Sequence, residues 1–302
     1  MSEIKRIKTI SEVHAVYGFD QPRHPLVSVL PIDERMTAFD YANDRYAFDF
    51  YQISLKEGIK GTLIYGRNTY DFQEGTMTFI KPNQVLRIEN SETFEGRAGW
   101  TLLFHPDLIR KSELGRNIDT YSFFGYEANE ALHLSSAEKK ALTHLAQYIE
   151  KEYSQNIDKH SQDLIIANID MMLKYCKRYY DRQFYTRTNL NKDILARFEG
   201  VMRDYYLSDA PIHRGVLSVK HCAQLLHLSP NYFGDLVKTE TGRNAKDHIQ
   251  DYIIEQAKNE LLSSDLSVGE IAYKLGFEYP QGLNRLFKAK TGVSPTIYRN
   301  VN

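Results

Sequence analysis

Three histidines in the first 130 residues could bind a metal ion: His14, His24 and His105. They are widely spaced and fall on different predicted elements, whereas a metal site needs ligands that converge on one cation. No Gly-x-Ser-x-Gly segment, which holds the nucleophile of many hydrolases, occurs in the sequence. The sequence therefore argues against a metalloenzyme or a hydrolase, and it predicts no catalytic residue, no metal site and no cofactor.

Three polar side chains near the C-terminus could instead form hydrogen bonds with nucleic-acid bases. The amides of Gln281 and Asn284 can each pair with the edge of an adenine, and the guanidinium of Arg285 can pair with guanine through two hydrogen bonds. A helix face that is merely solvated carries the same residue types. The meaning of these side chains therefore depends on the elements that position them.

Those elements belong to a tandem repeat. Leu217–Ile249 reads LSVKHCAQLLHLSPNYFGDLVKTETGRNAKDHI, and Leu266–Tyr298 reads LSVGEIAYKLGFEYPQGLNRLFKAKTGVSPTIY. Both copies begin Leu-Ser-Val, share alanine and leucine at the same offsets, and end in a lysine, two residues and Thr-Gly. Each copy predicts two amphipathic helices joined by a turn, and the second copy has one extra residue in that turn.

The shared residues have local structural reasons. Ser218 and Ser267 stand where a helix N-cap is expected, and Ser267 with Glu270 forms a capping-box pattern. Gly242 and Gly292 follow the second helix of each copy, where a left-handed residue commonly ends a helix. A single pair of this kind would be equally compatible with a plain αα-hairpin, so the duplication is what favours a helix-turn-helix unit.

The turn and the linker strengthen this prediction. Gly276 occupies the turn of the second copy, where φ is often positive, and His227 holds that position in the first copy. A helix predicted over 244–262 joins the two units, 217–242 and 266–292. Its 19 residues would span about 28 Å, near the roughly 34 Å that separates successive turns of duplex DNA.

Leu217–Tyr298 resembles the DNA-binding domain of the AraC/XylS family. The resemblance rests on residues at matching positions of the second copy: Ile271-Ala272, Leu275-Gly276-Phe277, Leu286-Phe287-Lys288, Lys290-Thr291-Gly292, Ser294-Pro295 and Tyr298-Arg299. It implies a transcriptional regulator that binds double-stranded DNA, contacts RNA polymerase if it is an activator, and often carries an N-terminal cupin-like β domain that senses a small molecule.

The resemblance also implies which residues contact bases. The matching solvent-facing positions are Gln281, Asn284 and Arg285 in the second copy, with Pro280 beside them, and Asn231, Gly234 and Asp235 in the first. Gly234 has no side chain, and Asp235 puts a negative charge near phosphates, although it can accept from cytosine. We therefore expect the second copy to supply most sequence discrimination and the first mainly to position the protein. Five cations are candidates for phosphate contacts: Lys238, Arg243, Lys288, Lys290 and Arg299.

The rest of the chain predicts an α+β protein with a cupin-like β-barrel or sandwich over 1–130, a helical linker or dimerisation segment over 131–190 and the DNA-binding domain over 191–302. The predicted strands are short and rich in β-branched and aromatic residues: Val27–Leu30, Tyr46–Leu55, Gly61–Tyr65, Thr76–Ile80, Val85–Ile88 and Gly99–His105. Helices are expected from Ser135 or Ser136, over about Ser161–Phe184 and over about Asp193–Leu207. The apolar stripes within Ser135–Arg187 suggest a homodimer.

An effector pocket in the β domain is one hypothesis, and an ordinary core is the alternative. The aromatic residues that would line such a pocket are Tyr46, Phe48, Phe50, Tyr65 and Trp100. Two further alternatives stay open: a regulator that responds to a protein partner instead of a small molecule, and a cupin-type metalloenzyme.

Composition alone does not indicate nucleic acid. The chain has 302 residues and a net charge of −1, and Pro211–Asn302 has 11 Lys and Arg against 9 Asp and Glu, a net charge of +2. Cys176 and Cys222 lack zinc-site spacing and are expected to be buried small apolar residues without a disulfide. The N-terminal MSEIKRIKTI does not resemble a signal peptide, and no apolar run is long enough to span a bilayer, so a cytoplasmic protein is expected.

Overall fold

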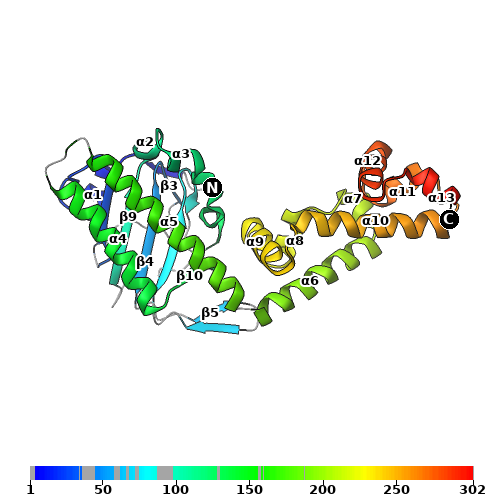
Figure 1. Ribbon diagram of the computed structural model, residues 1–302, viewed down its shortest axis with the longest axis horizontal. Coiled ribbons are helices and arrows are strands. Elements are labelled where there is room, and N and C mark those ends of the chain that lie inside the picture. Colours follow the sequence, from blue (N-terminus) through cyan, green and yellow to red (C-terminus); the bar gives the residue numbers. More distant parts are fainter. Residues whose placement is uncertain are drawn as a thin grey trace. The chain divides into compact units, whose positions relative to one another are not determined.

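The computed structural model describes residues 4–33, 35, 45–57, 62–65, 68–71, 75–86, 98–127, 130–155, 158, 160–186 and 188–301. These residues fold into two compact units, Met1–Gln183 and Phe184–Asn302. The described strands all lie in the first unit, and the second unit is built from helices (Figure 1).

The first unit contains two small groups of strands beside one larger antiparallel sheet. The larger sheet has the order β10-β7-β4-β9-β2 and consists of β2 (Val27–Pro31), β4 (Tyr51–Glu57), β7 (Thr76–Ile80), β9 (Ala98–Phe104) and β10 (Leu132–His133). The smaller groups are β1 (Ile4–Ile7), β3 (Arg45–Phe48) and β8 (Val85–Leu86), and the pair β5 (Thr62–Tyr65) and β6 (Asn68–Asp71). The predicted β region is present, but its described strands do not close into a barrel, so a cupin-like barrel is not confirmed.

The larger sheet is buried on both faces because helices cover it. Side chains alternate between the two faces of a strand, and in β9 both sets are buried. Helices α4 (Ser136–Ser154) and α5 (Ser161–Thr186) lie over one face (Figure 1), where the Trp100 indole N–H donates to the Thr143 hydroxyl at 3.1 Å. On the other face Leu103 packs with Ile10 of α1 (Ile10–Tyr17). The remaining helical turns of this unit are α2 (Pro106–Ile109), α3 (Glu113–Asn117), η2 (Ile118–Thr120) and η3 (Ser122–Gly125).

The strand predicted over Tyr46–Leu55 is wrong in one respect, because the chain breaks it at Asp49 and Phe50 into β3 and β4. The Asp49 N–H donates to the Ile7 carbonyl at 3.0 Å, and its carboxylate pairs with Arg6 at 2.6 Å. The partners lie 42 and 43 residues away from Asp49 in the sequence, so no local pattern predicts these contacts. The prediction also missed the elements β1, α1, β6 and β10, and the ends of the expected strands at Gly61 and at residues 87–88 lie outside the described residues.

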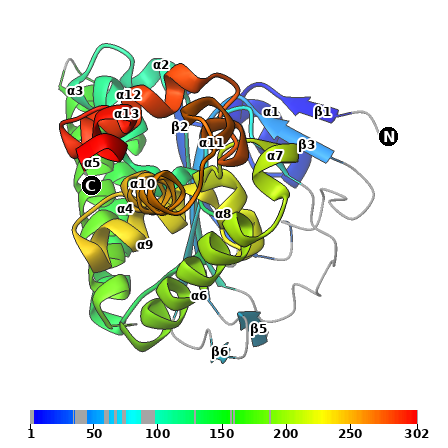
Figure 2. The same cartoon turned by 90° about the vertical axis from the view of Figure 1, so that its right-hand side faces the viewer.

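The second unit is organised around one long helix. Its helices are α6 (Thr188–Leu207), α7 (Ala210–Arg214), α8 (Val219–Leu225), α9 (Pro230–Thr241), α10 (Ala245–Ser263), α11 (Val268–Lys274), α12 (Pro280–Thr291) and α13 (Pro295–Val301). Helix α10 contacts α8 and α9 as well as α11, α12 and α13, and Figure 2 shows it almost end-on between them. The predicted linker helix is therefore confirmed, and α6 begins five residues before its predicted start at Asp193.

Cys176 and Cys222 are buried and unpaired with each other, as predicted. Burial raises the pKa of the Cys222 thiol to about 12, and it also raises the pKa of Cys176. Neither side chain is therefore a thiolate at neutral pH. No helix in the described part of the chain combines the length and the hydropathy of a membrane span.

The single tryptophan of the chain makes the packing of α4 on the sheet measurable. Replacing Thr143 by Val leaves the buried indole N–H of Trp100 without its acceptor, which costs about 1–2 kcal/mol. Urea unfolding followed by tryptophan fluorescence should show that loss, while Thr143→Ser, which keeps a hydroxyl, unfolds near the wild-type midpoint. Equal midpoints for the Val and Ser variants would contradict a contribution from this hydrogen bond.

Candidate nucleic-acid interface

Two helix-turn-helix units, α8–α9 and α11–α12, are present where the repeat predicted them. His227 and Gly276 occupy the two turns with φ of 57° and 88°, so the prediction of a left-handed residue at both positions is confirmed. The Ser218 hydroxyl accepts the His221 N–H at 3.1 Å, and Ser267 forms the predicted capping box with Glu270. Local hydrogen bonds therefore set the start and the turn of each unit.

The second helix of each unit ends in the same way. Gly242 and Gly292 have φ of 72° and 82°, and each donates its N–H to the lysine carbonyl four residues earlier at 2.9 Å. The preceding hydroxyls of Thr241 and Thr291 lie 2.7 and 2.8 Å from carbonyl oxygens one turn back. The repeated Thr-Gly pair thus closes both helices. The threonine hydroxyl contacts were not predicted from the sequence.

Helix α12 presents the predicted base-contacting residues on one exposed side. Gln281, Asn284 and Arg285 are all exposed, whereas Leu283 and Phe287 are completely buried on the other side. Asn284 and Arg285 follow Gln281 by three and four residues, a spacing that places the three polar side chains on one face of the helix. Their amides and guanidinium are thus available to a ligand that approaches from solvent.

Helix α9 presents a different surface at the matching positions. Asn231 is exposed, but Gly234 and Asp235 are only partly exposed. This face offers fewer and shorter side chains than the matching face of α12. The base-contacting roles of both sets stay predictions.

The start of α12 adds a residue that the sequence did not single out. Tyr279 holds the N-cap position without a capping hydrogen bond from its side chain, and 63% of it is exposed. In the first copy this position is Ser229, which is buried and caps α9 through the Tyr232 N–H at 3.2 Å. The extra residue in the second turn was the signal that this end of the helix differs. Tyr279 is therefore a further candidate contact beside Gln281.

The five predicted phosphate contacts fall into two groups. Lys238 and Lys288 are exposed on the two second helices. Arg243 and Lys290 both pair with Asp251 of α10, and Arg299 donates to the carbonyl oxygens of Leu261 and Leu266 at 2.9 and 2.7 Å. The last three cations thus make contacts inside the unit that the sequence did not predict, and their role toward phosphate stays a prediction.

The charges around Asp251 shift its titration. Burial alone would raise the pKa of its carboxyl group, but hydrogen bonds from Lys290 and Arg243 outweigh burial and hold the pKa below its ordinary value. The same contact raises the pKa of Arg243. The Asp251 carboxyl group therefore stays ionised at neutral pH. Asp247 also lies 3.9 Å from the Lys290 ammonium, so two carboxylates face these two cations.

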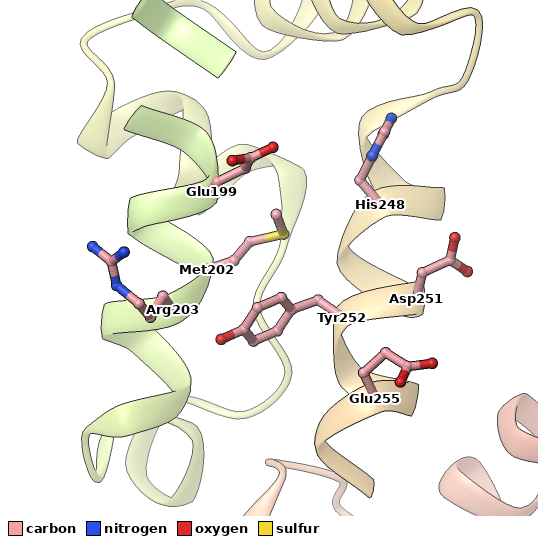
Figure 3. Close-up of a pocket in the computed structure, with 7 residues that line it drawn as sticks. All are labelled: Glu199, Met202, Arg203, His248, Asp251, Tyr252 and Glu255. Carbon is pink, nitrogen blue, oxygen red and sulfur yellow. The ribbon is translucent and has the colours of Figure 1, made fainter. Parts of the chain in front are cut away.

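An open groove of about 420 Å³ lies between α6 and α10 of the second unit. Figure 3 shows its seven lining residues, Glu199, Met202, Arg203, His248, Asp251, Tyr252 and Glu255. Met202 and Tyr252 project into the space between the two helices, whereas the Asp251 carboxylate points away from α6. The carboxylates of Glu199 and Glu255 oppose the approach of a phosphate backbone, so we place no nucleic-acid contact in this groove.

The candidate effector residues of the first unit are mostly part of a packed core. Tyr46, Phe48 and Phe50 belong to one buried cluster, and Trp100 is buried against α4. The side chain of Tyr65 lies outside the described residues. A cavity of about 40 Å³ beside Phe48 has room for water but not for a metabolite.

The three histidines considered as metal ligands each contact nearby protein groups. His14 lies 2.5 Å from the Asp20 carbonyl oxygen and 2.9 Å from the Ser28 hydroxyl. His24 and His105 accept backbone N–H groups two residues ahead, and His105 is the N-cap of α2. Within the described residues, no three His, Cys, Asp or Glu side chains converge as a metal site requires.

Comparison with known proteins points to the same C-terminal region. A family model described as a helix-turn-helix domain matches residues 222–300. The HTH-type transcriptional regulator YobQ of Bacillus subtilis (strain 168) is 32% identical over 98 residues, which are 32% of this chain and 41% of YobQ. The HTH-type transcriptional regulator YfiF of the same organism is 23% identical over 256 residues, covering 83% of this chain and 77% of YfiF.

Among solved structures, the C-terminal domain of AraT, a response regulator from Geobacillus stearothermophilus, is 27% identical with a TM-score of 0.32. It covers 36% of this chain and 85% of that one. The chain spans less than half the length of YobQ.

These matches define the class of the C-terminal region as a helix-turn-helix domain. More specifically, the chain carries at its C-terminus a domain of the AraC/XylS type, as the resemblance implied. The curated relatives YobQ and YfiF are both named as HTH-type transcriptional regulators.

The two turns differ in how much space they leave, which gives a stability test. A Cβ atom on Gly276 would lie 2.5 Å from the carbonyl carbon of Gly215, and its φ is positive. Gly276→Ala should therefore destabilise the second helix-turn-helix unit by about 1–3 kcal/mol. Hydrogen exchange measured by mass spectrometry should show lost protection over 268–291.

The matched control is His227→Ala at the corresponding turn of the first unit. His227 already carries a Cβ at positive φ and is exposed, so exchange over 219–241 should change little. Equal loss of protection in both variants would show that the close approach of Gly215 to Gly276 is not what makes the substitution Gly276→Ala destabilising.

Proposed function

We propose that this chain is a sequence-specific, DNA-binding transcriptional regulator whose second helix-turn-helix unit supplies most of the base discrimination. The observation that carries this proposal is the exposed row of Gln281, Asn284 and Arg285 on α12, within a unit that occurs twice around α10. An amide or guanidinium on such a helix can form paired hydrogen bonds with base edges in the major groove.

The geometry of α10 supports binding across two grooves. Its 19 residues correspond to about 28 Å, so second helices attached at different points along it can enter successive major grooves, which are about 34 Å apart. One polypeptide would then contact two half-sites on the same side of the duplex. The partial exposure of Gly234 and Asp235 supports a positioning role for α9.

Control by a small-molecule effector in the first unit is the finer part of the proposal. In this mechanism the cupin-like β region binds the effector, and binding shifts the population that is competent for DNA. A protein partner that acts on the same unit is the alternative, and the packed cluster around Phe48 keeps that alternative open. A homodimer through α4 and α5 is supported by exposed apolar side chains on both helices, including Tyr148 and Met171. RNA polymerase would be a further partner if the protein is an activator.

Selection of bound sequences from random duplex DNA tests the function directly. We expect enrichment of two motifs whose centres are about one helical turn apart. The selection is repeated with a metabolite extract, and a change in enrichment or in the fluorescence of Trp100 would reveal an effector. A pool without enriched sequence at physiological salt would overturn the proposed function, and identical pools with and without extract would overturn effector control.

Replacing Arg285 by Ala tests whether α12 contacts bases. We expect a loss of about 1–3 kcal/mol in binding to the selected site and relaxed preference at one base pair. Lys288→Ala is the control, because a phosphate contact weakens binding to selected and scrambled DNA by the same factor and lowers the salt dependence. Asp235→Ala should change base preference less than Arg285→Ala. Fluorescence anisotropy titrations supply the affinities, and an equal loss on both DNAs for Arg285→Ala would disprove the base contact.

A further inference from the structure

Asp251 lies at the meeting point of three elements in the second unit. Its two carboxylate oxygens bind different cations: Arg243 donates to one, and the Lys290 ammonium lies 2.8 Å from the other. Asp247, one turn earlier on α10, is 3.9 Å from the same ammonium. Both carboxylates therefore face the cations from one side of α10.

The two cations come from the ends of the two second helices. Arg243 directly follows Gly242, which ends α9, and Lys290 is in the last turn of α12. A single carboxylate on the helix between them thus joins the C-terminal ends of both. Charge-assisted hydrogen bonds of this kind are directional, whereas the apolar packing of α10 fixes closeness but little orientation.

This network is not required by the helix-turn-helix fold itself. In the repeat, Lys290 aligns with Glu240, and Arg243 aligns with Val293. Glu240 instead accepts the Asn191 side-chain amide of α6 at 2.6 Å. The two copies therefore share their turns and their Thr-Gly ends but use these aligned positions for different contacts. The network that joins the two copies is additional to the fold that each copy repeats.

We propose that Asp251 is a positioning residue that fixes the orientation of the two second helices relative to each other, and thereby the half-site spacing that the protein accepts. This inference rests on the proposed DNA-binding function. The Asp251 side chain is 40% exposed, and partly exposed ion pairs contribute little to overall stability. Spacing preference is therefore the property that should respond to its loss.

The experiment uses the full chain and duplexes that carry the two selected motifs at the selected spacing, or with one or two base pairs added or removed. Each added base pair moves one motif by about 3.4 Å and rotates it around the duplex. Dissociation constants are measured for the wild type, Asp251→Asn and the control Asp265→Asn. Asp265 is exposed in the connection between α10 and α11, and its substitution changes the net charge equally.

We expect Asp251→Asn to bind the selected spacing about 3- to 10-fold more weakly and to lose most of the penalty that the wild type shows for altered spacing. Asp265→Asn should keep the wild-type penalty. Lys290→Met should reduce the spacing penalty as much as Asp251→Asn does, because each substitution breaks the ion pair between Lys290 and Asp251. The double variant should show no further reduction. Circular dichroism of each variant checks that its helices are intact.

Three results would overturn the inference. An unchanged spacing penalty in Asp251→Asn would exclude a positioning role. Tighter binding to every duplex by the same factor would mean that Asp251 only masks two phosphate-contacting cations. Additive effects of Asp251→Asn and Lys290→Met would mean that the two residues act separately. If the wild type binds no selected sequence at any spacing, the proposed DNA-binding function itself fails. That result is seen with the wild type alone, so it differs from a failure of the role assigned to Asp251.

Discussion

The C-terminal compact unit, Phe184–Asn302, depends on the burial of α10 between its two helix-turn-helix units. The buried residues of α10 are distributed around the helix: Ala245, Ile249, Ile253, Ile254, Ala257 and Leu261. A helix with a single apolar stripe packs against one side of a protein, but α10 contacts helices of both helix-turn-helix units. Because packed interiors tolerate few voids, neither unit can shift along α10 without repacking that surface. This packing sets where α9 and α12 lie along α10.

The two copies show which features a local fold demands and which are free to differ. Both need an N-cap, a left-handed turn residue and a closing Thr-Gly, and both have them. On the outward faces the two copies differ, and Asp235 and Arg285 stand at matching positions with opposite charge. The asymmetry of the proposed DNA contacts is therefore compatible with an almost symmetric scaffold.

What the sequence could predict follows from the range of the interactions involved. Caps and turns depend on residues within one helical turn of each other, so Ser267 with Glu270 and His227 were predictable. The break between β3 and β4 depends on Arg6, which is 43 residues from Asp49, and no periodicity contains that information. Likewise Arg243 and Lys290 were recognised as cations, but their common partner Asp251 lies on a third element. Base-contacting residues were predictable as types on a face, and the ion pairs that hold those faces were not.

The charges of the second unit give the proposed spacing control its importance. The C-terminal region has a net charge of only +2, and Arg243 and Lys290 share the carboxylate of Asp251. Sequence-independent affinity comes from cations that neutralise phosphates, so each unit alone should bind DNA weakly. Two weak sites joined rigidly bind much more tightly than either one, but only where the geometry allows both to engage at once. A protein with this charge balance would depend on the fixed orientation of α9 and α12, which is why a single carboxylate between them could decide which DNA sites are bound.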